Sequence, residues 1–261
     1  MGVVNITPDS FSDGGRFLGE AAAVAQARRL IADGADLLDI GGESTRPGAA
    51  PVSEADELAR VLPAIRAIRA ESDIPISVDT MKPGVARAAV AAGASIWNDV
   101  MALQAPGSLE TAAELGCEVI LMHMLGDPRT MQDDPRYDHV VEDVVARLSE
   151  RIEAAVAAGV RREAIWLDPG VGFGKRLAHN LALIAHLDRL VGLGQRVLLG
   201  VSRKSFLKGV DPLAADPKDR LGGSIACALI GAQAGVAAVR AHDVRETAQA
   251  LKVQAAVCAA R

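Results

Sequence analysis

The chain has 261 residues, of which 50% are hydrophobic and 23% are charged, a composition typical of a protein that buries a substantial core. Its formal net charge is −5, and the sequence contains no long basic run. Both features argue against a general nucleic-acid-binding protein. Aromatic residues make up only 3% of the chain, too few for the stacking platforms that bind single-stranded nucleic acid or carbohydrate. A site for an anionic small molecule stays open, because local charge can oppose the net charge.

The cysteines and the chain start favour an intracellular location. Cys117, Cys227 and Cys258 are odd in number and lack the spacing of a zinc site or a disulfide framework, so we expect free thiols in a reducing cytoplasm. No signal peptide is recognisable, and the longest apolar stretch, from 225 to 239, is interrupted by Gln233 and by glycines. The sequence therefore predicts a cytoplasmic protein without a membrane span.

Short apolar runs recur along the whole chain, and each is followed by a loop and a segment with helical spacing. Strands alternating with helices predict parallel strands that are covered by helices on the outside. The predicted strands are Met1–Asn5, Leu37–Ile40, Ile76–Asp79, Ser95–Asp99, Glu118–Met122, Ile165–Asp168, Val197–Gly200 and Ala237–Arg240.

The segments between these strands carry the apolar stripes of amphipathic helices. One stripe runs from 58 to 68, after Ser53 and Asp56, which together resemble a capping box; a second runs from 141 to 156, and a last helix is expected from about Val244. Eight such units in a chain of this length predict an α/β fold, a (β/α)8 TIM barrel, as a single domain over residues 1–261. A doubly wound open sheet is the alternative, but no dinucleotide fingerprint follows the first strand.

Polar residues lie at the carboxyl ends of the predicted strands, where barrel enzymes have their active sites. Asp39, Asp79 and Asp168 directly follow apolar strand residues, so we expect them to be partly desolvated and to need cationic partners. Lys204 and Arg240 are suitably placed to supply them across the mouth of the barrel. The loops at 7–15 and 41–48 are rich in Gly, Ser and Thr, and could close over an anion.

Several of these segments resemble the signatures of the dihydropteroate synthases, a pterin-binding barrel family. The resemblance is ordered and spans nearly the whole chain. It rests on NITPDSFSDGG at 5–15, DIGGESTRPG at 39–48, SVDT at 77–80, ND at 98–99, MHM at 122–124, LDPGVGFGK at 167–175, GVSRKS at 200–205 and RAHDV at 240–244.

The resemblance implies one reaction of folate biosynthesis. It would condense 6-hydroxymethyl-7,8-dihydropterin diphosphate with 4-aminobenzoate, giving 7,8-dihydropteroate and diphosphate. It also implies Mg2+ as cofactor, a homodimer, and inhibition by sulfonamides, which mimic 4-aminobenzoate. Members of the family usually have residues before the first strand, so we expect reduced stability from the short amino-terminal segment rather than lost chemistry.

The resemblance further implies roles for residues at the strand ends. Asp168 would accept two bonds from the amino edge of the pterin, and Asn98 and Lys204 would contact the same heterocycle. Arg240 would stack on the flat ring and meet phosphate, while His242 would bind diphosphate oxygens.

The remaining implied roles concern the metal, the developing cation and the second substrate. Asn5 would supply an oxygen ligand to Mg2+, and Asp79 would stabilise a cation at the pterin methylene carbon as diphosphate leaves. The implied catalytic residues are Asp79, Asp168, Lys204, Arg240 and His242. The 4-aminobenzoate would be held by Thr45, Arg46, Pro47, Phe173 and Ser202, and Met122 completes the substrate-binding residues.

Three alternatives to the synthase stay open at this point. A methyltetrahydrofolate methyltransferase would explain the pterin-binding residues but not the anion-type loops, and a non-catalytic pterin-binding homologue would keep the pocket without the reaction. A barrel aldolase would use Lys204 to form an imine, although carboxylates nearby should keep that lysine charged.

Overall fold

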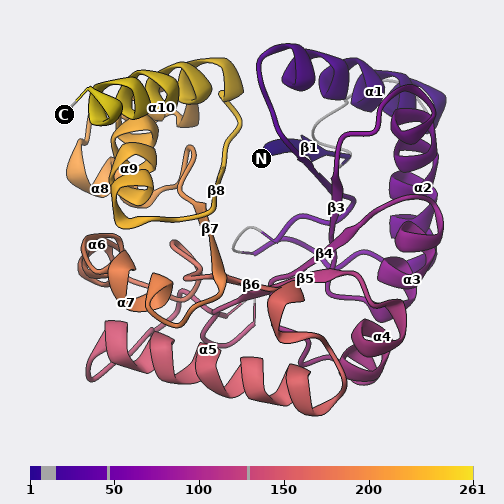
Figure 1. The fold of residues 1–261 in the computed structure, drawn as a ribbon, viewed down its shortest axis with the longest axis horizontal. Helices are drawn as coiled ribbons and strands as arrows, with labels where there is room; N and C mark the ends of the chain where they lie inside the picture. Colours follow the sequence, from indigo (N-terminus) through magenta and orange to yellow (C-terminus); the bar gives the residue numbers. More distant parts are fainter. Residues whose placement is uncertain (7–15, 46–47, 128–129, 261) are drawn as a thin grey trace.

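The computed structural model describes residues 1–6, 16–45, 48–127 and 130–260. Its centre is a sheet of parallel strands that follow one another in chain order, each paired with the next (Figure 1). The strands are β1 (Gly2–Asn5), β2 (Leu38–Gly41), β3 (Ile76–Asp79), β4 (Ile96–Asp99), β5 (Glu118–Met122), β6 (Ile165–Asp168), β7 (Arg196–Gly200) and β8 (Ala238–Arg240).

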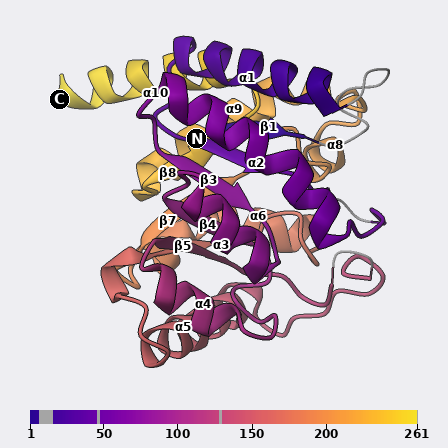
Figure 2. The same ribbon diagram turned by 90° about the vertical axis from the view of Figure 1, so that its right-hand side faces the viewer.

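Helices form a ring around the outside of the strands, and α1 to α4 follow one another along one side of the molecule (Figures 1 and 2). They are α1 (Arg16–Ala32), α2 (Glu54–Glu71), α3 (Pro83–Ala91), α4 (Ser108–Leu115), α5 (Val140–Ala157), α6 (Leu177–Ala185), α7 (Leu187–Val191), α8 (Phe206–Val210), α9 (Leu221–Ala234) and α10 (Val244–Ala259), with 3-10 turns at η2 (Arg162–Ala164) and η3 (Pro217–Arg220).

The sheet closes on itself between β8 and β1. Ala241 N donates to Met1 O at 2.9 Å, and Gly2 pairs with Ala241 in a parallel bridge. On the outside, α10 comes to lie beside the end of α1, near Gly34 (Figures 1 and 2). The TIM barrel predicted from the strand–helix alternation is therefore confirmed, and each predicted strand agrees with the observed one to within a residue at each end.

Alternation along the strands divides the buried residues into two sets. Those facing outward, such as Ile40, Trp97 and Leu167, join the large core between the strands and the helices. Those facing inward form an apolar layer at the amino-terminal end of the barrel and a polar layer at the carboxyl end. The apolar layer consists of Met1, Leu37, Ile96, Ile120, Trp166 and Leu198.

The start of α2 shows how local sequence places a helix next to the barrel mouth. Ser53 Oγ accepts a hydrogen bond from Asp56 N at 3.1 Å, which is the N-cap that the sequence predicted. In a complete capping box the side chain at the third helical position accepts a hydrogen bond from the backbone N–H of the N-cap residue. Here Asp56 Oδ2 instead accepts from the Ser53 hydroxyl, at 2.6 Å. Aspartate is one methylene shorter than glutamate and satisfies the nearer donor.

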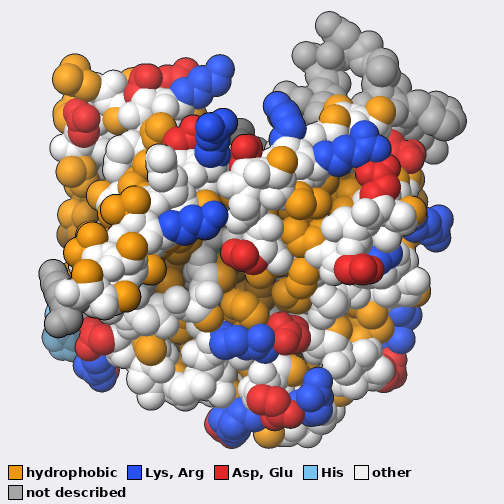
Figure 3. All heavy atoms as spheres, turned by 45° about the horizontal axis from the view of Figure 1, so that its top comes forward, with side chains coloured by type: hydrophobic (Ala, Val, Ile, Leu, Met, Phe, Trp, Pro, Cys, Tyr) orange, Lys and Arg blue, Asp and Glu red, His pale blue; other side chains and the backbone are white. Residues whose placement is uncertain are grey.

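On the face drawn in Figure 3, Lys and Arg side chains are interspersed with Asp and Glu side chains. Within the ranges the structure describes, no helix combines the length and apolar character needed to cross a membrane. The three cysteines are free, as expected.

The inward apolar layer supplies a test of the fold. Ile120 is fully buried in it, so Ile120→Ala should lower the free energy of unfolding by about 2–5 kcal/mol through lost contacts and a residual cavity. The matched control is Val253→Ala on α10, where the side chain is 58% exposed. The control should change stability by less than about 0.5 kcal/mol in urea titrations. Equal effects at both positions would contradict the assignment of the inner layer.

Candidate active site

The polar layer gathers side chains from strands that are far apart in the sequence. Register pairs Gly41 of β2 with Asp79 of β3, and Asp79 with Asn98 of β4. On the other side, Met122 of β5 pairs with Asp168 of β6, and Gly200 of β7 pairs with Arg240 of β8. All these residues lie at the carboxyl ends of their strands, so their side chains surround one opening.

Arg240 is the cation at the centre of this layer. Its Nε donates to Asp39 Oδ2 at 2.6 Å, and its Nη2 donates to Asp79 Oδ2 at 3.1 Å. Asp39 is completely buried, and Asn98 Nδ2 lies 3.4 Å from both of its carboxylate oxygens. Arg240 therefore pairs with two of the three strand-end carboxylates that the sequence analysis expected to need cationic partners.

One guanidinium faces two buried carboxylates, so both carboxyl groups can be ionised only with a surplus of negative charge. Desolvation and the neighbouring charge of Asp39 raise the pKa of Asp79 to about 8, although Arg240 acts in the opposite direction. Asp79 Oδ1 has no hydrogen-bond partner among the described residues. The site is therefore arranged to receive positive charge next to Asp79.

Asp168 and Lys204 form the opposite wall. Asp168 is buried, and its Oδ1 accepts a bond from Gly170 N at 2.7 Å. Its Oδ2 and Lys204 Nζ each lie 3.6 Å from the point where a Cβ on Gly200 would stand. Lys204 Nζ also donates to Val171 O and lies 4.6 Å from the centroid of the Phe173 ring. An acceptor, a cation and an aromatic face thus lie side by side.

Burial shifts both of these titratable groups. It raises the pKa of Asp168 against the lowering effect of Lys204, and it lowers the pKa of Lys204 to about 8 even though Asp168 acts to raise it. With this pKa, Lys204 is still mostly charged at neutral pH, as expected from the nearby carboxylates. Its pKa lies much closer to neutral than that of an exposed lysine.

The loop after β6 is held in place by a buried lysine that the sequence analysis did not single out. Lys175 Nζ donates to the carbonyl oxygens of Gly170 and Phe173, at 3.0 and 2.9 Å, and lies 2.9 Å from His123 Nδ1. A Cβ on Gly170 would stand 1.8 Å from His123 O, so only glycine allows the two loops to approach this closely. The density of glycines around Lys175 is the signal that could have found this contact.

The loops after β7 and β8 are joined by two further contacts. Ser202 Oγ lies 3.1 Å from both the backbone nitrogen and Nδ1 of His242. The Arg203 guanidinium makes two hydrogen bonds to the Asp243 carboxylate. Arg203 has a positive φ of 60°, a backbone conformation that is uncommon for residues other than glycine.

Asn5 lies at the same edge as Asp79. Asn5 Oδ1 and Asp79 Oδ2 are 3.8 and 3.7 Å from the position of a Cβ on Gly41. Oxygen donors of this kind suit Mg2+, and Asp79 Oδ1 is left without a partner. No group of three or more His, Cys, Asp or Glu side chains in the described part of the chain could hold a metal by itself. A magnesium ion here would need oxygens from the substrate and water.

Not all predicted substrate-binding residues can be placed. Thr45 is half-buried at the end of the segment that follows β2, Met122 is buried at the end of β5, and Phe173 is half-buried. Arg46 and Pro47, together with the predicted first loop at 7–15, lie outside the described residues.

The barrel fold, with charged side chains gathered at the carboxyl ends of its strands, is typical of a TIM-barrel enzyme that acts on a small charged substrate. A family described as pterin binding enzymes matches residues 1–242. The dihydropteroate synthase of Escherichia coli strain K12 is 47% identical over 261 residues, covering 100% of this chain and 92% of the relative.

Solved structures agree with the sequence matches. The Yersinia pestis dihydropteroate synthase with a sulfonamide drug complex has a TM-score of 0.94 and 47% identity, covering 99% of this chain and 94% of that chain. The Xanthomonas albilineans dihydropteroate synthase with 4-aminobenzoic acid has a TM-score of 0.94 and 51% identity, covering 99% and 92%.

The chain therefore belongs to the dihydropteroate synthase family of pterin-binding enzymes. It is a transferase, and its activity is the synthesis of dihydropteroate in folate biosynthesis. These full-length matches favour the synthase over the methyltransferase and the aldolase considered from the sequence.

The raised pKa of Asp79 predicts an opposition between stability and activity. The pKa of Asp79 is about 8 in the folded protein but has its ordinary value of 3.8 in the unfolded chain, so this group makes stability fall as pH rises between those values. Asp79→Asn removes that dependence. Its gain in unfolding free energy over the parent should increase from about pH 5.5 to 8.5 in urea titrations, while turnover falls. A gain that shrinks with pH would contradict the assignment.

Proposed function

We propose that the pterin diphosphate binds with its ring between Asp168 and Arg240. Asp168 accepts two N–H bonds from the 2-amino edge of the ring, because its buried carboxylate already faces the mouth and keeps one oxygen away from Gly170 N. Asn98 and Lys204 contact the same heterocycle from opposite sides. The observation that carries this proposal is the buried Asp168 facing Lys204 next to the Asp39–Arg240–Asp79 cluster, in a chain with full-length synthase relatives.

We assign the diphosphate to the side of the mouth lined by Asn5, Arg240 and His242. Ser202 lies against the His242 ring and fixes its orientation, which favours a defined contact to phosphate oxygens. Mg2+ would be held through Asn5 and would neutralise charge on the departing diphosphate. In addition to this contact with His242, we predict that Ser202 helps to hold 4-aminobenzoate.

We assign 4-aminobenzoate to the region between Phe173 and the loop that follows β2. Phe173 offers an aromatic face, with Lys204 Nζ 4.6 Å from its centroid. Thr45, Arg46 and Pro47 belong to the loop that would contact the ring and carboxylate, and Met122 supports the base of the pocket. The Xanthomonas albilineans relative with 4-aminobenzoic acid supports this choice of second substrate.

The proposed reaction is dissociative. The bond between the pterin methylene carbon and the diphosphate oxygen breaks, and its electron pair leaves with diphosphate. Asp79, as its carboxylate, stabilises the resulting cation, which is conjugated with the dihydropterin ring. The proton that Asp79 holds in the free enzyme passes to water as positive charge develops beside it. The neutral aromatic amine then attacks the methylene carbon and releases a proton to solvent. No strong general base is required.

The same proposal includes a homodimer in the cytoplasm. The dimer is carried by the family resemblance alone, and the cytoplasmic location by the sequence. Sedimentation of the purified chain over a range of concentrations tests the dimer directly.

A first assay tests the activity and the metal together. With Mg2+, the dihydropterin diphosphate and 4-aminobenzoate, the protein should release diphosphate and form dihydropteroate in equal amount. Omitting 4-aminobenzoate, or chelating Mg2+, should abolish product formation. Tight binding of the pterin diphosphate without release would instead favour the non-catalytic homologue.

The lowered pKa of Lys204 predicts the pH dependence of pterin binding. Lys204 carries its charge below about pH 8 and loses it above, so affinity for the pterin diphosphate should fall as pH rises through that value. Lys204→Arg keeps its charge and should hold its affinity to higher pH. Titration calorimetry of both proteins measures this difference. The same pH profile for both would count against a contact between Lys204 and the pterin.

A further inference from the structure

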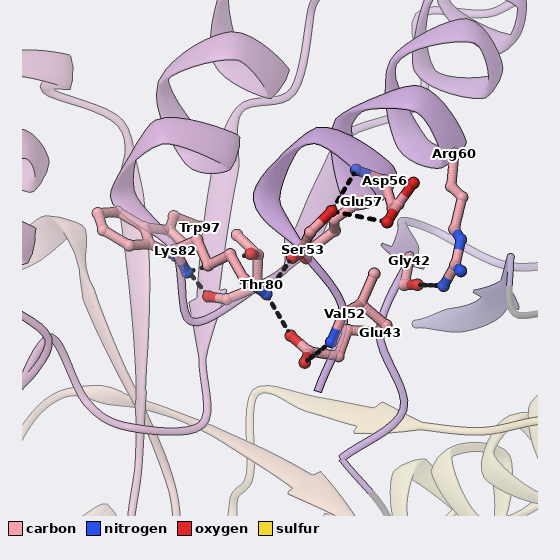
Figure 4. Close-up of polar contacts among 10 residues, drawn as sticks. All are labelled: Gly42, Glu43, Val52, Ser53, Asp56, Glu57, Arg60, Thr80, Lys82 and Trp97. Atoms are coloured by element: carbon pink, nitrogen blue, oxygen red, sulfur yellow. Dashed lines mark hydrogen bonds and ion pairs between the residues drawn. The ribbon is translucent and has the colours of Figure 1, made fainter. Parts of the chain in front are cut away.

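A buried ion-pair network lies at the base of the loop that joins β2 to α2 (Figure 4). Lys82 Nζ lies 2.5 Å from Glu43 Oε2 and 2.7 Å from Glu57 Oε2. The side chains of Glu43 and Glu57 are 5% and 0% exposed, and that of Lys82 is 22% exposed. None of these three residues belongs to the site described above, yet charges buried to this degree are costly unless each is paired.

Glu43 closes the loop by joining its two ends. While Oε2 faces Lys82, Oε1 accepts a hydrogen bond from Val52 N at 2.8 Å, nine residues further along the chain (Figure 4). One carboxylate therefore fixes the distance between the start and the end of the loop. A contact of this kind reduces the conformations open to the residues between.

The start of the loop is also fixed against α2. Arg60 Nη1 donates to Gly42 O at 2.8 Å (Figure 4). A Cβ on Gly42 would stand 2.8 Å from Val61 Cγ1, so the backbone lies directly on the helix. Glu57 is on the same helix, one turn before Arg60 and Val61. The loop base thus has a rigid floor, and Glu43 is the side chain that connects the loop to it.

The charges show why Lys82 controls this arrangement. Burial raises the pKa of Glu57, whereas the Lys82 ammonium and, to a smaller extent, the Thr80 hydroxyl lower it. Glu57 Oε1 has no hydrogen-bond partner among the described residues, so Lys82 accounts for the ion pair of this carboxylate there. Without Lys82, two carboxylates would face each other at the loop base. The one on the loop, Glu43, is better able to move away than the one inside α2.

Lys82 is held from the third strand. It precedes α3, and its backbone N donates to Thr80 Oγ1 at 3.2 Å. Thr80 O in turn accepts from Trp97 Nε1 at 2.8 Å, in the core (Figure 4). Lys82 therefore connects the loop after β2 to the segment that directly follows Asp79.

We infer that Lys82 is a positioning residue for the two ends of the loop after β2, at Glu43 and Val52, acting through Glu43 and without contact to substrate. This inference rests on the proposed function, in which that loop holds 4-aminobenzoate. Loss of the Lys82 ammonium releases Glu43 and loosens the loop, while the pterin site on β4, β6, β7 and β8 keeps its geometry.

The test compares Lys82→Met with Lys82→Arg and with Arg28→Met. Arg28 makes an exposed ion pair to Glu71 on α2, so its variant is a control for loss of a cation near that helix. In Lys82→Met the KM for 4-aminobenzoate should rise by about tenfold or more, whereas the Kd of the pterin diphosphate should change by less than about twofold. Lys82→Arg keeps the cation and should have a KM for 4-aminobenzoate close to that of the parent. Arg28→Met should leave this KM unchanged.

Hydrogen exchange at the Val52 amide gives a readout that is independent of activity. Because this amide donates to Glu43 Oε1, its exchange should accelerate in Lys82→Met and recover in Lys82→Arg. If Lys82→Met does not fold, Glu43→Gln takes its place, since it removes the charge on the loop and keeps the Lys82–Glu57 pair.

The outcomes separate this inference from the proposed function. A parent enzyme that makes dihydropteroate, combined with unchanged KM and unchanged Val52 exchange in Lys82→Met, overturns the positioning role alone. An equal loss of pterin and 4-aminobenzoate affinity overturns it too, since it indicates a general structural effect. Faster exchange at Val52 without a change in KM for 4-aminobenzoate contradicts the assignment of the loop to that substrate.

Discussion

Arg240 is the interaction on which the mouth of the barrel depends. It comes from β8, the last strand, and bonds to Asp39 on β2 and Asp79 on β3, the strands just past the seam where the sheet closes. Because both carboxylates are buried, the guanidinium is what allows them to face the interior at all. Burial and the charge of Asp39 together outweigh the effect of Arg240 and keep the pKa of Asp79 raised, so a positive charge next to Asp79 would favour its ionised form.

The remaining walls of the site are stiffened by buried contacts behind them. Lys175 and the close approach of Gly170 to His123 hold the loop that carries Phe173. The pairs Ser202–His242 and Arg203–Asp243 join the loops after β7 and β8. Lys82 has the corresponding place behind the loop after β2. In each case, residues outside the pocket fix the loops whose ends reach it, which is the preorganisation that a dissociative reaction needs.

This arrangement has a cost in stability. An apolar layer fills the amino-terminal half of the barrel interior, while the carboxyl half is filled with charged groups, one of which has an unsatisfied oxygen. The amino-terminal half thus contributes hydrophobic stabilisation, and the carboxyl half contributes the groups that take part in the reaction. Because the carboxyl half is charged for the reaction and not for stability, Asp79→Asn is expected to stabilise the free protein and to impair the enzyme.

The sequence by itself determined the eight strands, the barrel, the family and the charged residues at the strand ends. These rest on apolar periodicity and on motifs that are local along the chain, so they can be read without knowing what lies opposite. It also identified Asp39, Asp79 and Asp168 as carboxylates in need of partners.

Only the tertiary structure decided which partner each received. Arg240 is 201 residues from Asp39, and its choice of Asp39 and Asp79 over Asp168 follows from where the barrel closes. Lys175, buried between the loops after β5 and β6, and Lys82, between two glutamates, look like ordinary surface lysines in the sequence. Their burial and their partners come from closing eight strands into a ring, and burial is what converts a charged residue into a structural or catalytic one.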